Sequence, residues 1–281
     1  MLRGEVVSAS GGEMKRYLAT VEELKAGLAA KAVCVIDARR VPAYDGGHIP
    51  GAVMLDIFEH HWPDTTPRGV RAFVWQMGEV MRRVGVTNTK RVVAYDDESG
   101  MFAARLAWVL DWLGHPDAAM LDGGMKAWVA AGGKVSKEVA RAERSAWLPR
   151  PDASKVIRAD QIKRELKSLT VVDTRTPEEY AGTHVRAARG GTIPGAIPVH
   201  YVENVRAGKF KPLAEMRAMY EAAGVTQDQD IVLLCNGGYR SAHTYFALRM
   251  CGYKKVRNYY AAWQEWGNLP GLPVEVPRKK K

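Results

Sequence analysis

The chain has 281 residues, of which 47% are hydrophobic and 26% are charged, a balance typical of a globular protein. Its length allows two ordinary domains, and no apolar run is long enough to span a membrane, so we expect no membrane partner. The first 28 residues mix acidic and basic side chains and lack the apolar core of a signal peptide. We therefore expect a cytoplasmic protein that starts at either Met1 or Met14.

The formal net charge of +10 is unevenly distributed. Residues 158–281 contain 20 Lys and Arg against 12 Asp and Glu, whereas residues 1–157 contain 21 against 19. The sequence has no recognisable nucleic-acid-binding motif, so we expect no nucleic-acid partner. The pattern favours a basic field that attracts small anions to a cleft in the second half, with the three terminal lysines as a solvated tail.

An internal repeat at a spacing of about 138 residues organises the chain. Short β-branched runs that end in Asp-x-Arg occur at residues 33–39 and 169–175, and each predicts a buried strand with its polar end at a sheet edge. The turn sequence Ile-Pro-Gly-Ala follows each run, at residues 49–52 and 193–196. The two halves of the chain are therefore expected to share one fold.

A second matching strand in each copy precedes a polar loop and an apolar helix. The strands are predicted at residues 92–95 and 231–234, and the helices near residues 103–113 and 242–251. Gly114 and Gly252 are expected to end these helices, because glycine readily adopts the backbone conformation that follows a helix. Alternating strands and helices indicate parallel βαβ units, so each copy should be a small α/β domain.

The two copies differ at the end of this second strand, where Asp96 of the first copy matches Cys235 of the second. In open α/β sheets, ligands bind at the carboxyl ends of the strands. Adjacent glycines allow several N–H groups to point at one spot, the following helix presents its positive end there, and an arginine adds a cation. These features favour a thiolate and could also hold a persulfide. The predicted anion-binding loop consists of Cys235, Asn236, Gly237, Gly238, Tyr239, Arg240 and Ser241.

Two alternatives to a reactive Cys235 are considered. Free cysteines are usually inert and buried, but the Cys-x-x-Gly-x-Arg-Ser loop at a strand–helix junction favours reactivity. A cysteine phosphatase would place its arginine at a Cys-x5-Arg spacing. The Cys-x4-Arg spacing from Cys235 to Arg240 makes a smaller ring, which suits a single sulfur atom better than a phosphate group.

The other cysteines and a histidine-containing cluster are interpreted as structural. Cys34 lies in an apolar run, and Cys251 lies at the far end of the helix that follows Cys235, too distant for a direct disulfide. Adjacent histidines project in different directions, so His60 and His61 are assigned to a surface polar cluster and no metal site is expected.

The chain resembles the tandem-domain rhodanese family, the thiosulfate and 3-mercaptopyruvate sulfurtransferases, from about residue 14 to residue 277. The resemblance is carried by the repeated strands and turns, the Cys235 loop, and the Asp-Gly-Gly and Trp-Gln-Glu-Trp sequences at residues 122–124 and 263–266. It implies an α/β fold of two tandem rhodanese-like domains, each a small parallel sheet flanked by helices. The implied boundaries are 14–135 for an inactive first domain, 136–157 for a linker, and 158–278 for a catalytic second domain.

The resemblance also implies a reaction. The Cys235 thiolate would take the sulfane sulfur of thiosulfate, and the resulting persulfide would pass it to cyanide or a thiol acceptor without a metal or organic cofactor. The thiosulfate type is favoured because Glu179 precedes Tyr180, where mercaptopyruvate enzymes commonly have an arginine. The alternatives are a 3-mercaptopyruvate sulfurtransferase and a persulfide carrier that serves a protein partner.

Three arginines are predicted to bind the substrate. Arg240 is expected to contact the sulfonate oxygens. The family places further anion-binding arginines in the loop that here covers residues 182–191, so Arg186 and Arg189 are candidates. For each of them, an ordinary solvated surface charge is an equally good interpretation. Asp173 and Arg175, by contrast, are expected to form a structural ion pair.

Overall fold

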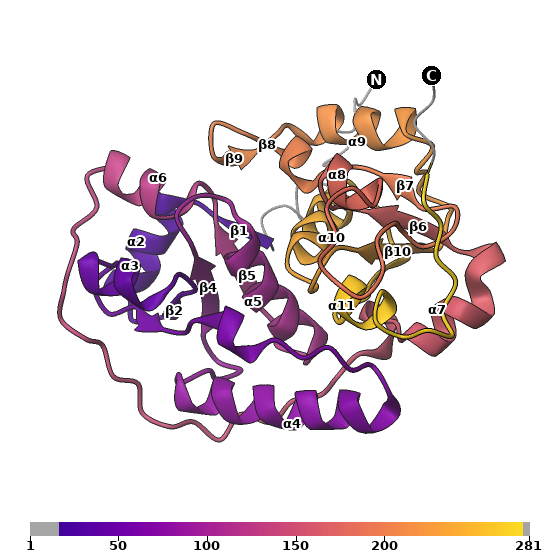
Figure 1. Ribbon diagram of the computed structural model, residues 1–281. Coiled ribbons are helices and arrows are strands. Elements are labelled where there is room, and N and C mark those ends of the chain that lie inside the picture. Colours follow the sequence, from indigo (N-terminus) through magenta and orange to yellow (C-terminus); the bar gives the residue numbers. More distant parts are fainter. Residues whose placement is uncertain (1–16, 278–281) are drawn as a thin grey trace, which may run out of the picture.

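The computed structural model describes residues 17–277, which form two α/β units that pack side by side (Figure 1). The alternative starts at Met1 and Met14 and the predicted lysine tail lie outside the described residues. Within residues 17–277, no helix combines the length and the apolar character needed to cross a membrane.

The first unit contains a parallel sheet with the strand order β1-β5-β4-β2-β3. Its strands are β1 (Leu18–Ala19), β2 (Val33–Asp37), β3 (Val53–Met54), β4 (Arg91–Tyr95) and β5 (Ala118–Leu121). Its helices are α2 (Val21–Ala29), α3 (Val41–Gly46), α4 (Pro67–Arg83), α5 (Met101–Trp112) and α6 (Gly124–Ala130), with a 3-10 turn, η1 (Ile57–His60).

The second unit repeats this arrangement in a parallel sheet with the order β11-β10-β6-β7. Its strands are β6 (Thr170–Asp173), β7 (Ile197–Pro198), β10 (Ile231–Leu234) and β11 (Val256–Asn258), with a small hairpin of β8 (Val205–Arg206) and β9 (Lys209–Phe210). Its helices are α7 (Ala159–Glu165), α8 (Pro177–Tyr180), α9 (Leu213–Ala222), α10 (Arg240–Met250) and α11 (Ala262–Trp266), with the 3-10 turns η2 (Ala153–Lys155), η3 (Leu166–Ser168) and η4 (Tyr201–Asn204).

The repeat predicted from the sequence is confirmed at the level of strands, helix ends and ion pairs. Gly114 and Gly252 adopt φ angles of 82° and 89° directly after the ends of α5 and α10, conformations that favour glycine. The Asp-x-Arg ion pair is buried in both units, with Nη2–Oδ2 distances of 2.7 Å for Arg39 and 2.6 Å for Arg175.

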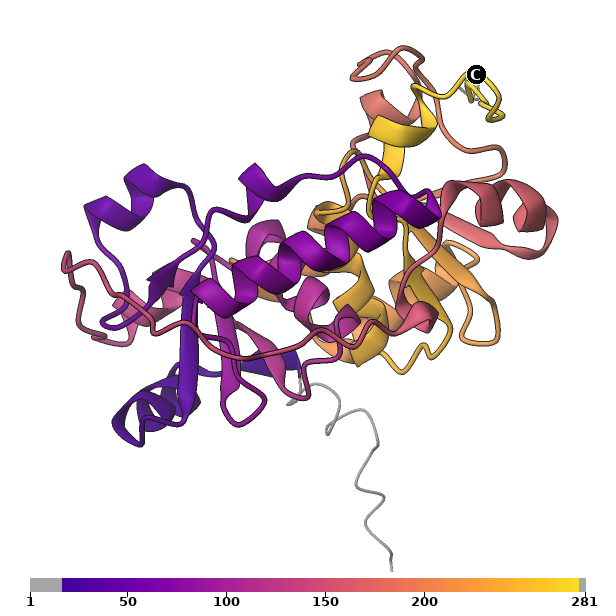
Figure 2. The ribbon, with the colours of Figure 1, turned by 90° about the horizontal axis from the view of Figure 1, so that it is seen from below.

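One hydrophobic core extends through both units, because α5 and α10 pack against each other where the units meet, and a second, smaller core lies within the first unit. The hydroxyl of Tyr245 in α10 donates to Oδ2 of Asp111 in α5 at 3.0 Å. Helix α4 also lies across the junction (Figure 2). Its Phe73 ring stacks on Tyr260 of the second unit, with ring centroids 5.0 Å apart. The interface is therefore part of the folded core and fixes the two units relative to each other.

Residues 137–152 form no helix or strand and run along the outside of the first unit before they reach the second (Figures 1 and 2). This segment lies within the stretch predicted as a linker. Its backbone is anchored, for example by hydrogen bonds from Ser145 N to Arg82 O (2.9 Å) and from Arg150 N to Leu113 O (2.7 Å).

Candidate active site

Cys235 occupies the carboxyl end of a central strand, directly after β10. Only 1% of its surface is exposed. Its main chain is held by the segment that begins α11, since Trp263 N donates to Cys235 O and Gln264 N donates to Asn236 O, both at 3.0 Å. The cysteine is therefore fixed at the sheet edge where open α/β folds bind ligands.

The loop after Cys235 directs hydrogen-bond donors at the sulfur atom. Gly238 N donates to Sγ at 3.0 Å, and the Ser241 hydroxyl lies 3.5 Å from it. Gly238 has a φ of 83°, and a Cβ at this position would lie 2.3 Å from Tyr260 O. Only glycine fits this turn, so the double-glycine motif is needed to curl the loop around the sulfur.

The surroundings of Cys235 lower its pKa. Burial opposes ionisation, but the charge of Arg240 and hydrogen bonds from Ser241 and Gly237 outweigh burial, so the pKa lies below its ordinary value. For Cys34 and Cys251, burial dominates and raises the pKa to about 11. Of the three thiols, only Cys235 is held in an environment that favours the nucleophilic thiolate.

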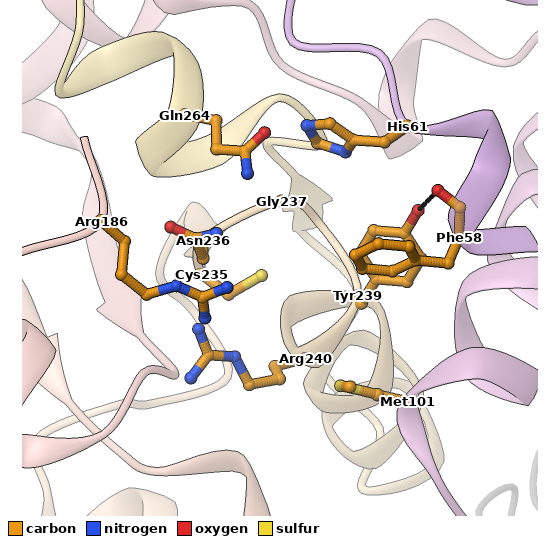
Figure 3. Close-up of a pocket in the computed structure, with 10 residues that line it drawn as sticks. All are labelled: Phe58, His61, Met101, Arg186, Cys235, Asn236, Gly237, Tyr239, Arg240 and Gln264. Carbon is orange, nitrogen blue, oxygen red and sulfur yellow. Dashed lines mark hydrogen bonds between the residues drawn. The ribbon is translucent and has the colours of Figure 1, made fainter.

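A cavity of about 230 Å³ opens above the sulfur and is lined by both units (Figure 3). Its size suits a small ligand. The second unit contributes Cys235, Asn236, Gly237, Tyr239, Arg240, Arg186 and Gln264, and the first contributes Phe58, His61 and Met101. The close-up shows the sulfur pointing into this space between the arginines and the aromatic residues.

Arg240 and Arg186 both reach the cavity but differ in their partners. Arg240 forms a two-pronged ion pair with Glu179, at 2.5 Å (Nη1–Oε2) and 2.9 Å (Nη2–Oε1). Burial opposes ionisation of Glu179, which is 3% exposed, but the bonds from Arg240 prevail and hold its pKa at about 2. Arg186, whose side chain is 47% exposed, has a single long contact with Glu179, at 3.5 Å. Arg186 is therefore the freer of the two cations.

Both halves of the chain match the model of the rhodanese-like domain, over residues 20–131 and 158–269. The chain belongs to the rhodanese family. It is 36% identical over 249 residues to the sulfur carrier protein TtuD of Thermus thermophilus, which covers 82% of this chain and 86% of that protein. It is 32% identical over 260 residues to a thiosulfate sulfurtransferase of Pseudomonas aeruginosa, covering 90% and 95%. The fold resembles that of SseA from Escherichia coli, a 3-mercaptopyruvate sulfotransferase, with a TM-score of 0.76, 24% identity, and coverage of 89% and 99%.

In the first rhodanese domain, the loop that corresponds to the Cys235 loop holds the carboxylate of its own Asp96. The carboxylate accepts hydrogen bonds of 3.1 Å from the backbone N–H groups of Gly100, Phe102 and Ala103. Burial raises the pKa of Asp96 to about 6, although these donors oppose the shift. The Asp96 carboxylate thus takes the position that the Cys235 thiol has in the second domain, and it already occupies three N–H donors of its loop.

Arg189, a predicted substrate-binding residue, does not line the cavity. Its guanidinium instead donates to main-chain carbonyls at the end of α11 and in the segment after it, those of Trp266, Gly267, Leu269 and Leu272. The structure therefore gives Arg189 a different position from the one expected: it fastens the C-terminal segment to the loop of residues 182–191.

His61 was assigned from sequence to a surface cluster, but it lies inside the cavity above Gly237. A Cβ on Gly237 would lie 2.9 Å from the His61 ring, which shows how closely the two residues pack. Burial and the charge of Arg105 lower the pKa of His61 to about 4, so its imidazole is neutral at neutral pH. Sequence spacing could not reveal this residue, because it reaches the site across the domain interface.

The contrast among the three thiols predicts their order of alkylation. Iodoacetamide should modify Cys235 at a pH below the ordinary cysteine pKa of about 8.5, while Cys34 and Cys251 should require a much higher pH. Peptide mapping after short exposures across a pH series measures this directly. If the three residues were modified with the same pH dependence, the loop would not favour a thiolate.

Proposed function

We propose that this rhodanese is a thiosulfate sulfurtransferase that carries the transferred sulfur as a persulfide on Cys235. The observation that carries the proposal is the set of donors around the Cys235 sulfur, where a backbone N–H, a hydroxyl and the nearby Arg240 favour a negative charge. The relatives named thiosulfate sulfurtransferase support the choice of donor. The cytoplasm, where thiols stay reduced, is the compartment that this chemistry favours.

In the first half-reaction, the Cys235 thiolate attacks the outer sulfur of thiosulfate. A new S–S bond forms, the S–S bond of thiosulfate breaks, and sulfite leaves with the electron pair. No proton is needed for this leaving group. Arg186, the freer cation of the cavity, faces the sulfonate oxygens, while Arg240 stays paired with Glu179 and stabilises the sulfur of Cys235.

In the second half-reaction, cyanide or a thiolate attacks the outer sulfur of the persulfide. The Cys–S–S bond breaks, and its electron pair returns to Cys235 as thiolate. The same donors that hold the thiolate also hold the anionic persulfide between the two steps, so one site serves both halves of a ping-pong cycle.

Glu179 favours thiosulfate over 3-mercaptopyruvate. It stands where mercaptopyruvate enzymes commonly have an arginine that could bind the substrate carboxylate, and here its own carboxylate is paired with Arg240. A persulfide carrier is the second candidate, because the relative TtuD is named as a sulfur carrier. A carrier would load one sulfur and turn over slowly with small acceptors.

Steady-state formation of thiocyanate from thiosulfate and cyanide separates these possibilities. The proposal predicts multiple turnovers, parallel double-reciprocal plots, and a kcat/KM for thiosulfate that exceeds the value for 3-mercaptopyruvate. A higher kcat/KM for 3-mercaptopyruvate would reverse the assignment of the donor. Rapid loading followed by negligible turnover would instead identify a carrier.

A further inference from the structure

Arg105 lies in α5 of the first rhodanese domain, where the two domains meet, and only 1% of its surface is exposed. Within residues 17–277, no carboxylate forms an ion pair with it, and its Nη2 has no hydrogen-bond partner. Four aromatic rings surround the guanidinium, with centroids 5.1 to 5.7 Å from Cζ: Phe73, Trp108, Tyr239 and Tyr260. Burying a cation without an acidic partner is costly, so its presence indicates a nearby negative charge of another kind.

Arg105 contacts the loop that surrounds the Cys235 sulfur. Its Nη1 donates to Gly238 O at 3.4 Å, and a Cβ on Gly238 would lie 2.7 Å from Nη1. Gly238 N in turn donates to Sγ of Cys235 at 3.0 Å. One residue of the loop therefore touches the guanidinium on one side and the sulfur on the other.

The charges around Arg105 identify its anionic partner. Burial lowers the pKa of Arg105, and the groups that oppose this effect are Tyr239, Cys235 and Tyr260. Both tyrosines have raised pKa values, about 12 for Tyr239, so they stay neutral at neutral pH. Of these three groups, only Cys235 has a lowered pKa, so its sulfur is the one that favours a negative charge, as thiolate or as persulfide.

Arg240, which belongs to the Cys235 loop itself, acts more directly on Cys235, but its charge is compensated. Its two terminal nitrogens are bonded to Glu179, so the pair carries no net charge at neutral pH. The cation of Arg105 has no such carboxylate partner among the described residues, and its burial weakens the screening of its charge by solvent.

We propose that Arg105 is a second counter-charge of the anionic sulfur on Cys235, besides Arg240, so that the domain without the reactive cysteine supplies a cation to the domain that has it. The inference rests on the proposed function, because a persulfide is the second anion it would stabilise. Arg105 does not touch the reacting atoms. It is a positioning residue that acts through its field and through the Gly238 loop.

The pH profile of Cys235 alkylation tests the inference, and two variants are compared with the wild type. Arg105→Met removes the charge but fills a similar volume. In this variant we expect the alkylation rate of Cys235 at pH 7 to fall about tenfold, because the pH profile moves to higher pH. Arg105→Lys keeps the charge and should stay within about threefold of the wild type. The melting temperature of each variant is measured beside its profile, so that a shift of the profile can be separated from a loss of folding.

Tyr245→Phe is the matched control. It removes the hydrogen bond to Asp111 at the same α5–α10 contact without changing any charge near the sulfur. We expect this variant to have a lower melting temperature and the same pH profile of Cys235 alkylation as the wild type. The remaining ionisable groups that face Cys235 are the same in all variants, namely Arg240, Tyr239, His61, Tyr201 and Arg186.

An unchanged profile in Arg105→Met would overturn the inference, as would a profile of Arg105→Lys that matches that of Arg105→Met. Should Arg105→Met not fold, Arg105→Gln provides a second neutral variant with the same expected shift. The proposed function is judged separately, by whether the wild-type protein takes sulfur from thiosulfate. If the wild-type protein takes up sulfur on Cys235 but the pH profile of alkylation in Arg105→Met matches that of the wild type, only the role of Arg105 is rejected.

Discussion

Cys235→Ser should reduce the formation of thiocyanate from thiosulfate and cyanide by at least about a thousandfold. A serine hydroxyl is not ionised at neutral pH, and it cannot form the S–S bond in which the sulfur is carried. The residue is small and buried, so the variant should keep its fold and its melting temperature close to that of the wild type. Initial rates at saturating cyanide, measured beside thermal unfolding, check both expectations.

Cys251→Ser and Cys34→Ser provide matched controls, because each removes a thiol whose pKa is raised by burial and which lies outside the Cys235 cavity. Both should keep the rate of the wild type within about twofold once their stability is taken into account. If Cys235→Ser retained most of the activity while Cys251→Ser lost it, the catalytic thiol would be misassigned.

Glu179→Gln should lower the free energy of unfolding by about 3–5 kcal/mol, because it leaves the charge of Arg240 buried without its partner. Glu179 is 3% exposed, and both of its oxygens bind the guanidinium. Chemical denaturation at neutral pH measures the loss. In the double variant Glu179→Gln/Arg240→Met, much of this stability should return, since the orphaned charge is gone.

The pH dependence of stability provides an independent check on the same pair. The pKa of Glu179 is about 2 in the folded protein, below its ordinary 4.5, so its contribution is fully present above about pH 4.5 and is lost as the pH falls toward 2. The free energy of unfolding of the Glu179→Gln variant should therefore fall less between about pH 4.5 and pH 2 than that of the wild type. An identical pH dependence in both proteins would show that the ion pair contributes little.

The repeat, the parallel strands and the reactive loop could be predicted from the sequence because each depends on local patterns. The run that becomes β10 is apolar throughout, and its residues are all buried. Cys235 and its loop followed from the double glycine, whose backbone freedom has a local physical reason. The ends of α5 and α10 followed from Gly114 and Gly252 in the same way.

The residues that reach the site across the domain interface could not be predicted. His61 and Arg105 act on the Cys235 loop from the first domain, and no spacing in the sequence connects them to it. Glu179 departs from the family pattern in the sequence alone, but its pairing with Arg240 depends on the placement of α8 beside α10. Arg189 illustrates the reverse case, because a guanidinium in a basic loop can bind carbonyl groups as readily as a substrate.

The most direct test of the account is the mass of the protein after brief mixing with thiosulfate and removal of the excess. We expect a gain equal to one sulfur atom, located by peptide mapping on Cys235, reversed by cyanide and absent in Cys235→Ser. No gain, or a gain on Cys34 or Cys251, would contradict it.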